Sequence, residues 1–387
     1  MNSISDRFRQ KHLLDLLEDY SFERGPLDFY VSLYFRKNKA LGSKDRAFIS
    51  ETIYALVRWM GLLDYICEIN KIPVTWKNRL SVYQHEDWKS RINDTSIDAH
   101  TRVSFPKVLF DLFVESHGFD KAFEIALFCN EPAPTTVRVN TMKISREALL
   151  EKWKQDGYEV IPCTESSCGI TFLKKINFFN LPEFTEGCFE VQDEASQLVA
   201  DLVQVLPKEQ VLDYCSGSGG KTLAFAAKLG GTGQIFLHDI RLSTLYEARR
   251  RLKRAGIQNA QILSSENKQV LRQLKKSMDW VLVDAPCTGT GTLRRNPDMK
   301  WRFTEEMLIR LVGQQRTIFE QAQSFVKPGG HIVYATCSIL KQENRDQMDR
   351  ILKIHPNLSL EGEVFESTPK PQSKDGMFAF VTKKALS

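Results

Sequence analysis

The feature that most constrains the fold of this chain is a regular alternation that begins after Glu209. Short apolar segments, which predict strands, alternate there with helical or loop segments; the predicted strands are residues 211–214, 234–238, 260–263, 280–283 and 331–335. Strands that alternate with helices are typical of a parallel, doubly wound α/β sheet. Ligands of such sheets bind beyond the carboxyl ends of the strands, so the residues at those ends are the first candidates for function.

The residues before this alternation predict two further parts. Residues 1–130 carry apolar side chains at helical spacing, as in 7–20 and 43–59, and show no convincing alternating strand pattern. Two prolines in Glu131-Pro-Ala-Pro134 disfavour helix and predict a domain junction. The pattern beyond it predicts a small α+β unit, with strands at 137–140, 159–162 and 169–173 and a helix at 146–156, and then a helix at 193–206. We therefore expect an all-α domain at 1–130, an α+β connector at 131–190 and a Rossmann-like domain at 191–387.

The composition of the 387 residues argues against several classes of protein. No segment approaches the roughly 18–20 apolar residues of a membrane span, and the N-terminus resembles no secretory signal, so we expect a soluble cytoplasmic protein. The eight cysteines form no C-x-x-C pair, which argues against a zinc site and a disulfide framework. The net charge of +5 is too mild to prove a polyanionic partner. The sequence has two basic runs. We interpret Arg241–Arg254 as a solvated helix face, whereas the interpretation of Arg294–Arg302 depends on the motifs beside it.

The first predicted strand leads into a glycine-rich turn, Cys215-Ser-Gly-Ser-Gly-Gly-Lys-Thr222. Its glycines let backbone amides approach a ligand, and the following helix N-terminus favours a phosphate or carboxylate. A P-loop would need glycine at Cys215, and a dinucleotide loop would need it at Thr222, so both patterns fail. The remaining interpretation is S-adenosylmethionine, with the Asp239 carboxylate, 22 residues beyond Gly217, on the ribose hydroxyls. The alternative for Asp239 is a helix N-cap.

Two thiols follow neighbouring strands. Asp284-Ala-Pro-Cys287 comes directly after the strand at 280–283, and Thr336-Cys-Ser338 after the strand at 331–335. A lone cysteine at a strand end is as often a small buried apolar residue as a functional one. Two of them in one crevice, with Asp284 beside them and a cofactor loop across the sheet, favour a reactive site.

These motifs resemble the Nol/Nop/Sun family of RNA (cytosine-5)-methyltransferases. The resemblance rests on the two cysteine motifs, the glycine loop and Arg294-Arg-Asn-Pro-Asp-Met-Lys-Trp301. It extends over nearly the whole chain: Ser43–Phe48 resembles a NusB-like RNA-binding domain, Arg138–Thr141 and Val191–Ser196 resemble the connecting segment, and Asp375–Phe378 resembles the C-terminal end. The fold that it implies is a Rossmann-like, S-adenosylmethionine-dependent methyltransferase domain preceded by an all-α NusB-like domain and a connector.

The implied activity is methylation of C5 of a cytosine in 16S ribosomal RNA. Cytosine C5 is a poor nucleophile, so a thiolate first adds to C6, and we assign this step to Cys337. The resemblance gives Cys287 the release of the product, and Asp284 the N3/N4 edge of a flipped cytosine. The implied partner is 16S ribosomal RNA or an assembling small subunit, bound by a monomer without metal or membrane.

The resemblance also implies further contacts. For S-adenosylmethionine these are Cys215, Ser216, Gly217, Ser218, Gly219, Gly220, Lys221, Asp239, Glu266 and Asp284. Glu266 stands where relatives usually carry aspartate, and Ser-Gly-Ser218 stands where they usually carry Ala-Ala-Pro. For RNA the implied contacts are Arg294, Arg295, Lys300 and Trp301, which suit phosphates and an unstacked base. The alternative for Trp301 is a packing role, and for Lys221 a solvated lysine.

Rival functions stay open at this point. An inactive RNA-binding ribosome-assembly factor would not need both Cys287 and Cys337, but one sequence does not exclude it. A DNA cytosine methyltransferase would use a Pro-Cys thiol, and hence Cys287, as the nucleophile, whereas the RNA-binder-like N-terminal region argues against it. An ATP hydrolase lacks the first glycine of its loop, and transfer RNA is an alternative substrate.

Overall fold

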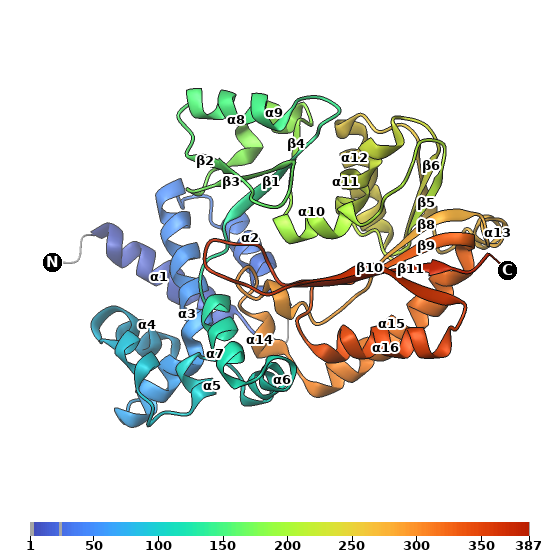
Figure 1. Ribbon diagram of the computed structural model, residues 1–387. Helices are drawn as coiled ribbons and strands as arrows, with labels where there is room; N and C mark the ends of the chain where they lie inside the picture. The colour runs from blue at the N-terminus through green and yellow to red at the C-terminus, as the bar shows by residue number, and fades with distance from the viewer. Residues whose placement is uncertain (1–3, 23–24, 387) are drawn as a thin grey trace. The chain divides into compact units, whose positions relative to one another are not determined.

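The computed structural model describes residues 4–22 and 25–386, and the chain divides into two compact units. One unit comprises the residues up to Pro132 together with Thr292–Met307; the other comprises Ala133–Gly291 and the residues from Leu308 onward. We call them the helical unit and the catalytic unit, and Figure 1 labels their elements.

The helical unit consists of helices, as predicted. They are α1 (Ile4–Asp19), α2 (Leu27–Lys37), α3 (Ser43–Ile69), α4 (Trp76–His85), α5 (Ala99–Arg102), α6 (Lys107–His117), α7 (Phe119–Cys129) and α14 (Met299–Arg302), with a 3₁₀ turn at Trp88–Asn93. The longest, α3, begins where the Asp45 carboxylate accepts the backbone N–H of Gly42 at 3.1 Å. Leu13, Leu16 and Leu17 of α1 are fully or almost fully buried and belong to the same apolar core as Ile49 and Ile53 of α3.

The segment that carries α14 belongs to the helical unit. The Lys300 ammonium donates to the Arg58 carbonyl at 2.6 Å and to Asn130 Oδ1 at 2.7 Å, and the Trp301 indole N–H donates to the Val57 carbonyl at 2.7 Å. These contacts tie Thr292–Met307 into the helical unit, so residues 191–387 do not form a single compact domain. The connector and the rest of residues 191–387 share the other unit.

The connector is a four-stranded antiparallel sheet covered by helices. Its elements are β1 (Thr135–Val139), α8 (Arg146–Gln155), β2 (Val160–Pro162), β3 (Gly169–Phe172), a 3₁₀ turn (Phe178–Asn180), α9 (Pro182–Thr185) and β4 (Phe189–Val191), with strand order β2-β3-β1-β4. Trp153 of α8 is fully buried against Phe172 and Phe189. The predicted strands and helix are present, but β4 was not expected because its three residues are too few for a periodic pattern.

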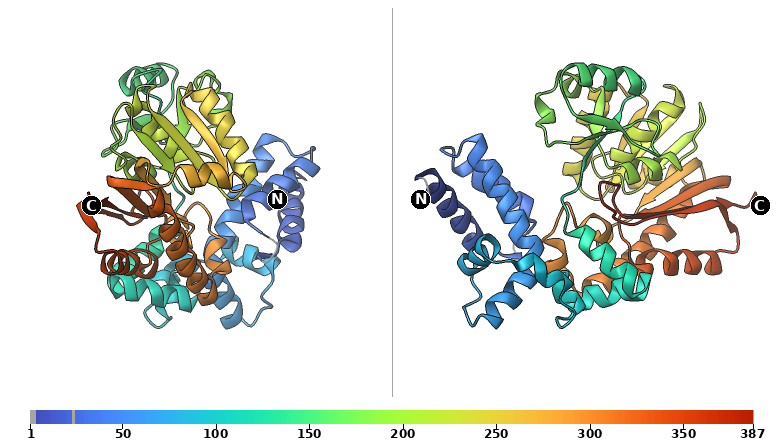
Figure 2. Two further views of the ribbon diagram at one scale, coloured as in Figure 1. Left: turned by 90° about the vertical axis from the view of Figure 1, so that its right-hand side faces the viewer. Right: turned by 60° about the vertical axis from the view of Figure 1, so that its left-hand side comes forward.

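The main sheet has seven strands. They are β5 (Gln210–Asp213), β6 (Gln234–Asp239), β7 (Ala260–Ser264), β8 (Met278–Asp284), β9 (Val326–Thr336), β10 (Leu358–Ser367) and β11 (Met377–Lys384), in the order β10-β11-β9-β8-β5-β6-β7. The five predicted strands lie side by side and parallel. The hairpin of β10 and β11, red in Figures 1 and 2, adds antiparallel strands beside β9, so the sheet is mixed rather than purely parallel.

Helices follow most strands of this sheet. They are α10 (Glu194–Asp201), α11 (Gly220–Phe225), α12 (Leu242–Ala255), α13 (Lys268–Gln273), α15 (Glu305–Ala322) and α16 (Arg345–Ile354), with 3₁₀ turns at Ala226–Leu229, Thr290–Thr292, Gln323–Phe325 and Lys341–Glu343. Val211 and Leu212, which are adjacent in β5, point to opposite faces of the sheet and pack in two different apolar clusters. Because both faces are covered, the strands are continuously apolar and their functional residues are confined to the ends.

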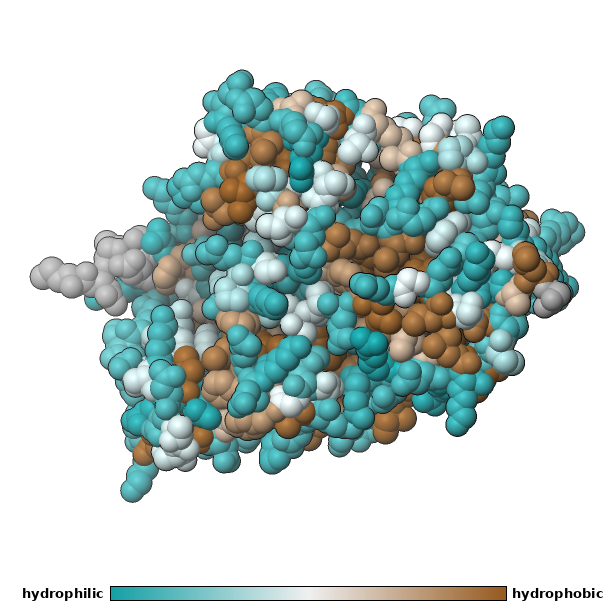
Figure 3. All heavy atoms as spheres, in the orientation of Figure 1, coloured by the Kyte–Doolittle hydropathy of each residue, from teal (hydrophilic) through white to brown (hydrophobic). Residues whose placement is uncertain are grey.

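The surface gives two further observations. On the face drawn in Figure 3, apolar side chains gather over α10 and beside the β10–β11 hairpin, and hydrophilic side chains surround them. Among the described residues, no helix is long and apolar enough to cross a membrane.

Candidate active site

The glycine loop between β5 and α11 is held against β6. The Ser216 N–H donates to the His238 carbonyl at 2.9 Å, and Gly217 and Gly219 adopt left-handed conformations with φ of 52° and 78°. A Cβ atom at Gly219 would lie 3.3 Å from Leu237 and 3.4 Å from Ala248. Glycine is therefore required at position 219 both by its backbone conformation and by the close approach of its neighbours.

Asp239, at the end of β6, closes on this loop. Its carboxylate accepts the backbone N–H of Gly217 at 2.9 Å and that of Arg241 at 2.8 Å. Burial alone raises the pKa of Asp239, but the hydrogen bonds from Arg241 and Gly217 outweigh burial and lower it. The N-cap position of α12 is Arg241, so Asp239 is not the N-cap of that helix. The Asp239 carboxylate is thus ionised and lies beside the glycine loop.

The two predicted thiols meet beyond β8 and β9. These strands are parallel and pair Asp284 with Ala335, so their following loops leave the sheet side by side. The Sγ atoms of Cys287 and Cys337 are 3.3 Å apart, and the Gly291 N–H donates to the Cys337 carbonyl at 2.9 Å. The hydrogen bond with Cys337, followed by burial, raises the pKa of Cys287 well above its usual value. Cys287 therefore holds its proton more strongly than an ordinary thiol does.

An ion pair joins the helix that follows the glycine loop to the end of β8. The Lys221 ammonium, in the first turn of α11, is 2.5 Å from Asp284 Oδ2 at the end of β8. Burial lowers the pKa of Lys221, but the Asp284 carboxylate and the charge on Cys337 outweigh burial and raise it. The lysine is 9% exposed, so it is not the solvated residue that the alternative described.

Two buried polar atoms beside the loop have no hydrogen-bond partner within the described part of the chain. They are Asp213 Oδ1 and Ser216 Oγ. The other Asp213 oxygen accepts the Thr222 hydroxyl at 2.7 Å. Buried polar atoms are normally hydrogen-bonded, so the two atoms fit contact with a polar ligand, such as the amino-acid end of S-adenosylmethionine.

Comparisons with known proteins bear on this site. Residues 200–382 match the family described as 16S rRNA methyltransferase RsmB/F, and residues 105–178 match its ferredoxin-like domain. The chain belongs to this methyltransferase family. The second match crosses residue 130, so the family's ferredoxin-like region begins before the predicted connector.

Similar individual proteins also carry methyltransferase names. The chain is 30% identical over 275 residues to a probable ribosomal RNA small subunit methyltransferase B of Synechocystis sp., and 34% identical over 227 residues to the ribosomal RNA small subunit methyltransferase B of Pseudomonas syringae pv. tomato. These alignments cover 70% and 58% of this chain, but only 61% and 50% of the relatives' lengths. The crystal structure of PH0851 matches 96% of this chain and 97% of its own, with a TM-score of 0.80 and 23% identity, which shows a shared fold.

The structure also places residues near the thiols that sequence reasoning missed. Glu343 is fully buried, and its carboxylate accepts the Thr288 N–H at 2.9 Å, the Thr288 hydroxyl at 2.5 Å and the Gln315 amide at 2.9 Å. Thr288 follows Cys287 directly, so Glu343 fixes the loop that carries this thiol. Asp213 was missed as well. The available signal was the position of each carboxylate: Asp213 lies one residue before the end of the predicted strand 211–214, and Glu343 follows Cys337 by six residues.

Other predicted residues lie elsewhere. Glu266 is exposed in the turn after β7, where its N–H donates to the Ser264 hydroxyl at 3.1 Å. The predicted RNA contacts Arg294, Arg295, Lys300 and Trp301 all belong to the helical unit. Lys300 is 1% exposed, and its hydrogen-bonding capacity is used inside that unit, so in this conformation it does not offer its charge to a phosphate.

Proposed function

We propose that this chain methylates C5 of a cytosine in 16S ribosomal RNA, with S-adenosylmethionine as the methyl donor and Cys337 as the nucleophile. The observation that carries the proposal is the 3.3 Å approach of the Cys287 and Cys337 thiols beside the Lys221–Asp284 ion pair. The relatives' names support the ribosomal substrate.

The glycine loop and Asp239 hold the cofactor. Backbone amides of the loop and the N-terminus of α11 receive its carboxylate, and the ionised Asp239 accepts the ribose hydroxyls. The unpartnered Asp213 and Ser216 oxygens suit its polar amino-acid end. When bound, S-adenosylmethionine supplies an electrophilic methyl group on a sulfonium.

The thiols divide the covalent chemistry between them. The Cys337 thiolate forms a bond to C6, which moves an electron pair toward C5 and lets C5 take the methyl group. A base then removes the proton from C5, the C6–sulfur bond breaks, and the electron pair returns to Cys337 as a thiolate. Cys287 assists this release, because it lies within hydrogen-bonding distance of the Cys337 sulfur and exchanges its proton there.

Asp284 and Lys221 prepare the site electrostatically. The Lys221 ammonium interacts with a negative charge on the Cys337 sulfur, and it is proposed to stabilise the charge that develops there during the reaction. Asp284 orients this ammonium and offers its carboxylate to the N3/N4 edge of the cytosine. Arg295 stays a proposed RNA contact. Arg294, which is 2% exposed, is proposed with Lys300 and Trp301 to support the segment that carries Arg295.

The test is to trap the covalent intermediate. Cys287→Ala, Cys337→Ala and the double variant are expressed in cells, and RNA that remains attached to the denatured protein is sequenced. We expect an adduct in Cys287→Ala that is absent from the double variant, because only Cys337 can form it and only Cys287 can release it. Cys188→Ala, which changes a partly exposed cysteine of the connector, is the matched control and should carry no adduct.

The other outcomes select among the rivals. An adduct in Cys337→Ala alone would reverse the two roles and favour the Pro-Cys nucleophile of DNA methyltransferases. If the attached RNA is transfer RNA instead of 16S ribosomal RNA, the substrate of this chain is transfer RNA. Absence of any adduct, together with retained binding of S-adenosylmethionine by calorimetry, would favour an inactive assembly factor.

A further inference from the structure

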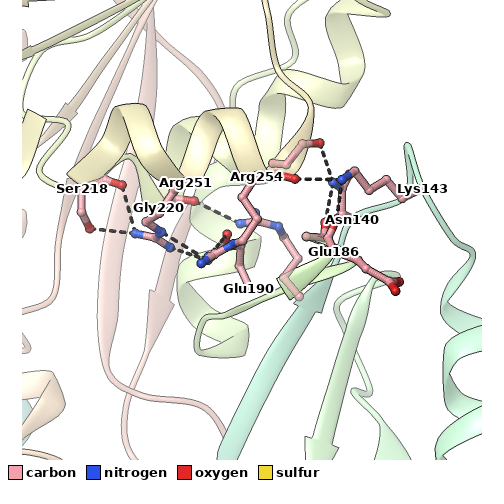
Figure 4. Close-up of polar contacts among 11 residues, drawn as sticks. Asn140, Lys143, Glu186, Glu190, Ser218, Gly220, Arg251 and Arg254 are labelled. Carbon is pink, nitrogen blue, oxygen red and sulfur yellow. Dashed lines mark hydrogen bonds and ion pairs between the residues drawn. The ribbon is translucent and has the colours of Figure 1, made fainter. Parts of the chain in front are cut away.

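The basic helix α12 does not present all of its cations to solvent. Arg249, Arg250 and Lys253 are exposed, but Arg251 and Arg254 turn toward the connector strand β4 (Figure 4). This outcome corrects the interpretation of Arg241–Arg254 as a solvated face only, because side chains that are adjacent on a helix point in different directions.

The target of both inward arginines is Glu190. Arg251 donates from Nε at 3.2 Å and from Nη2 at 3.0 Å to one Glu190 oxygen, and Arg254 donates at 2.5 Å to the other. The Glu190 side chain is only 6% exposed. A carboxylate at this depth is stabilised by paired cations, and the forked guanidinium fixes the direction of each hydrogen bond.

The same Arg251 guanidinium also reaches the glycine loop. Its Nη1 donates to the Ser218 carbonyl at 3.0 Å and to the Ser218 hydroxyl at 2.7 Å (Figure 4). One side chain thus joins a connector carboxylate to the middle of the loop that is proposed to bind the cofactor.

Two further side chains, from the connector and the residue after it, form hydrogen bonds to the end of the glycine loop. The Gly220 carbonyl accepts Arg138 Nη1 at 3.0 Å and Gln192 Nε2 at 3.2 Å. Arg138 lies in β1 and is 5% exposed, and Gln192 follows β4 directly. Two loop carbonyls, those of Ser218 and Gly220, are therefore fixed by side chains that are themselves buried or paired with the connector.

Fixing these carbonyls also directs the amides. The peptide group is planar and trans, so the N–H of the next residue points away from the carbonyl of the same peptide. The fixed Gly220 carbonyl thus turns the Lys221 N–H away from the connector, at the helix terminus where an anion would be received. A loop with glycine at 217, 219 and 220 has little stiffness of its own, so an outside support determines how well its donors are preorganised.

We propose that Glu190 and Arg251 are positioning residues for S-adenosylmethionine: the connector, through this pair, holds the glycine loop in its binding conformation. The inference rests on the proposed cofactor site. It assigns the connector a role in cofactor affinity in addition to any role in RNA recognition.

The test is Arg251→Lys in the full chain. Lysine keeps a positive charge beside Glu190, but a single ammonium does not span both Glu190 and Ser218. We expect the calorimetric Kd for S-adenosylmethionine to rise about tenfold, which corresponds to about 1.4 kcal/mol. The KM for S-adenosylmethionine should rise in parallel, whereas kcat at saturating cofactor on a 16S rRNA transcript should change less than about twofold.

Matched variants separate positioning from general stability. Arg250→Lys changes the neighbouring, exposed arginine that pairs with Glu247, and it should bind S-adenosylmethionine as the original chain does. Glu190→Gln should weaken binding in the same direction as Arg251→Lys, and the double variant should show less than the product of the two effects, because both substitutions break one linkage. Ser218→Ala removes only one acceptor and should give a smaller loss.

The outcomes are distinct. An unchanged Kd and KM in folded Arg251→Lys and Glu190→Gln, even with a lower melting temperature, would assign the pair a purely structural role and overturn the inference. If Arg251→Lys does not fold, Ser218→Ala and Glu190→Gln decide by the same two constants. If the original chain itself binds no S-adenosylmethionine, the proposed cofactor site fails, and the inference fails with it.

Discussion

Asp213 offers a test of the electrostatics beneath the glycine loop. Its side chain is 1% exposed, and one of its oxygens has no hydrogen-bond partner in the described part of the chain. Burial raises the pKa of Asp213 from 3.8 to about 7; the Thr222 hydrogen bond opposes this shift, and the Asp284 carboxylate adds to it. The substitution Asp213→Asn keeps the shape of the side chain and removes its titration.

The expected magnitude follows from the two pKa values. Between 3.8 and about 7, the folded state holds a proton that the unfolded state releases, so this group stabilises the fold at low pH. That stability is fully present below 3.8 and is lost as the pH rises through about 7. At 1.36 kcal/mol per pKa unit the whole effect is about 4 kcal/mol, of which about 2.5 kcal/mol is lost between roughly pH 5 and 8.

The measurement compares the two chains at the two pH values. Native-state hydrogen exchange of amides in β5 and β8, corrected for its intrinsic pH dependence, reports the unfolding free energy of the catalytic unit. We expect Asp213→Asn to gain about 2.5 kcal/mol relative to the original chain on going from about pH 5 to 8. Any pH-independent effect of the substitution cancels in this comparison. Parallel pH profiles for the two chains would refute a raised pKa at Asp213.

Four further substitutions test other parts of the structure. Gly219→Ala should destabilise the catalytic unit by about 1–3 kcal/mol, because position 219 has a left-handed backbone and a Cβ there would press on Leu237 and Ala248. Gly313→Ala should instead stabilise α15 by about 0.5–1 kcal/mol, because a Cβ there meets no described atom within 4 Å. Urea unfolding measures both changes, and equal effects of the two substitutions would contradict the argument. Lys221→Met should lower the single-turnover rate of methyl transfer about 10²–10³-fold, because the Cys337 thiolate loses its neighbouring cation, and an unchanged rate would remove Lys221 from the mechanism. Lys300→Met leaves the Arg58 carbonyl and Asn130 Oδ1 without their donor, so it should lower the unfolding free energy of the helical unit by about 2–4 kcal/mol. Weaker RNA binding at an unchanged unfolding free energy would instead restore Lys300 as an RNA contact.

The sequence predicted what depends on local pattern and on the geometry of parallel sheets. The five parallel strands were predicted from short apolar runs, and the convergence of Asp284, Cys287 and Cys337 followed from their places after neighbouring strands. The β10–β11 hairpin was not predicted, because the pairing of β11 with β9 is a long-range contact that leaves no period in the intervening residues.

Side-chain direction within a helix was harder to predict. The run Arg249-Arg-Arg251 is uniform in sequence, yet Arg250 pairs with Glu247 on the surface and Arg251 is nearly buried against Glu190. The partner that distinguishes them lies 61 residues away from Arg251, in a three-residue strand that the pattern did not indicate. Likewise, the sequence does not reveal the partners of Lys300 and Trp301. Their backbone acceptors, the carbonyls of Arg58 and Val57, lie more than 240 residues away, and the Asn130 side chain that also accepts from Lys300 lies 170 residues away.

The thiol pair shows where prediction from topology ends. Parallel pairing of Asp284 with Ala335 places the exits of β8 and β9 at one edge, which any doubly wound sheet would do. The 3.3 Å separation of the sulfurs depends in addition on the loops: the Gly291 N–H holds the Cys337 carbonyl, and Glu343 holds Thr288 beside Cys287. A proton can pass directly between two sulfurs at this distance, whereas it could not if either loop relaxed by a few ångströms. The buried Glu343 is therefore as necessary to the proposed division of labour between the thiols as the strands that bring them together.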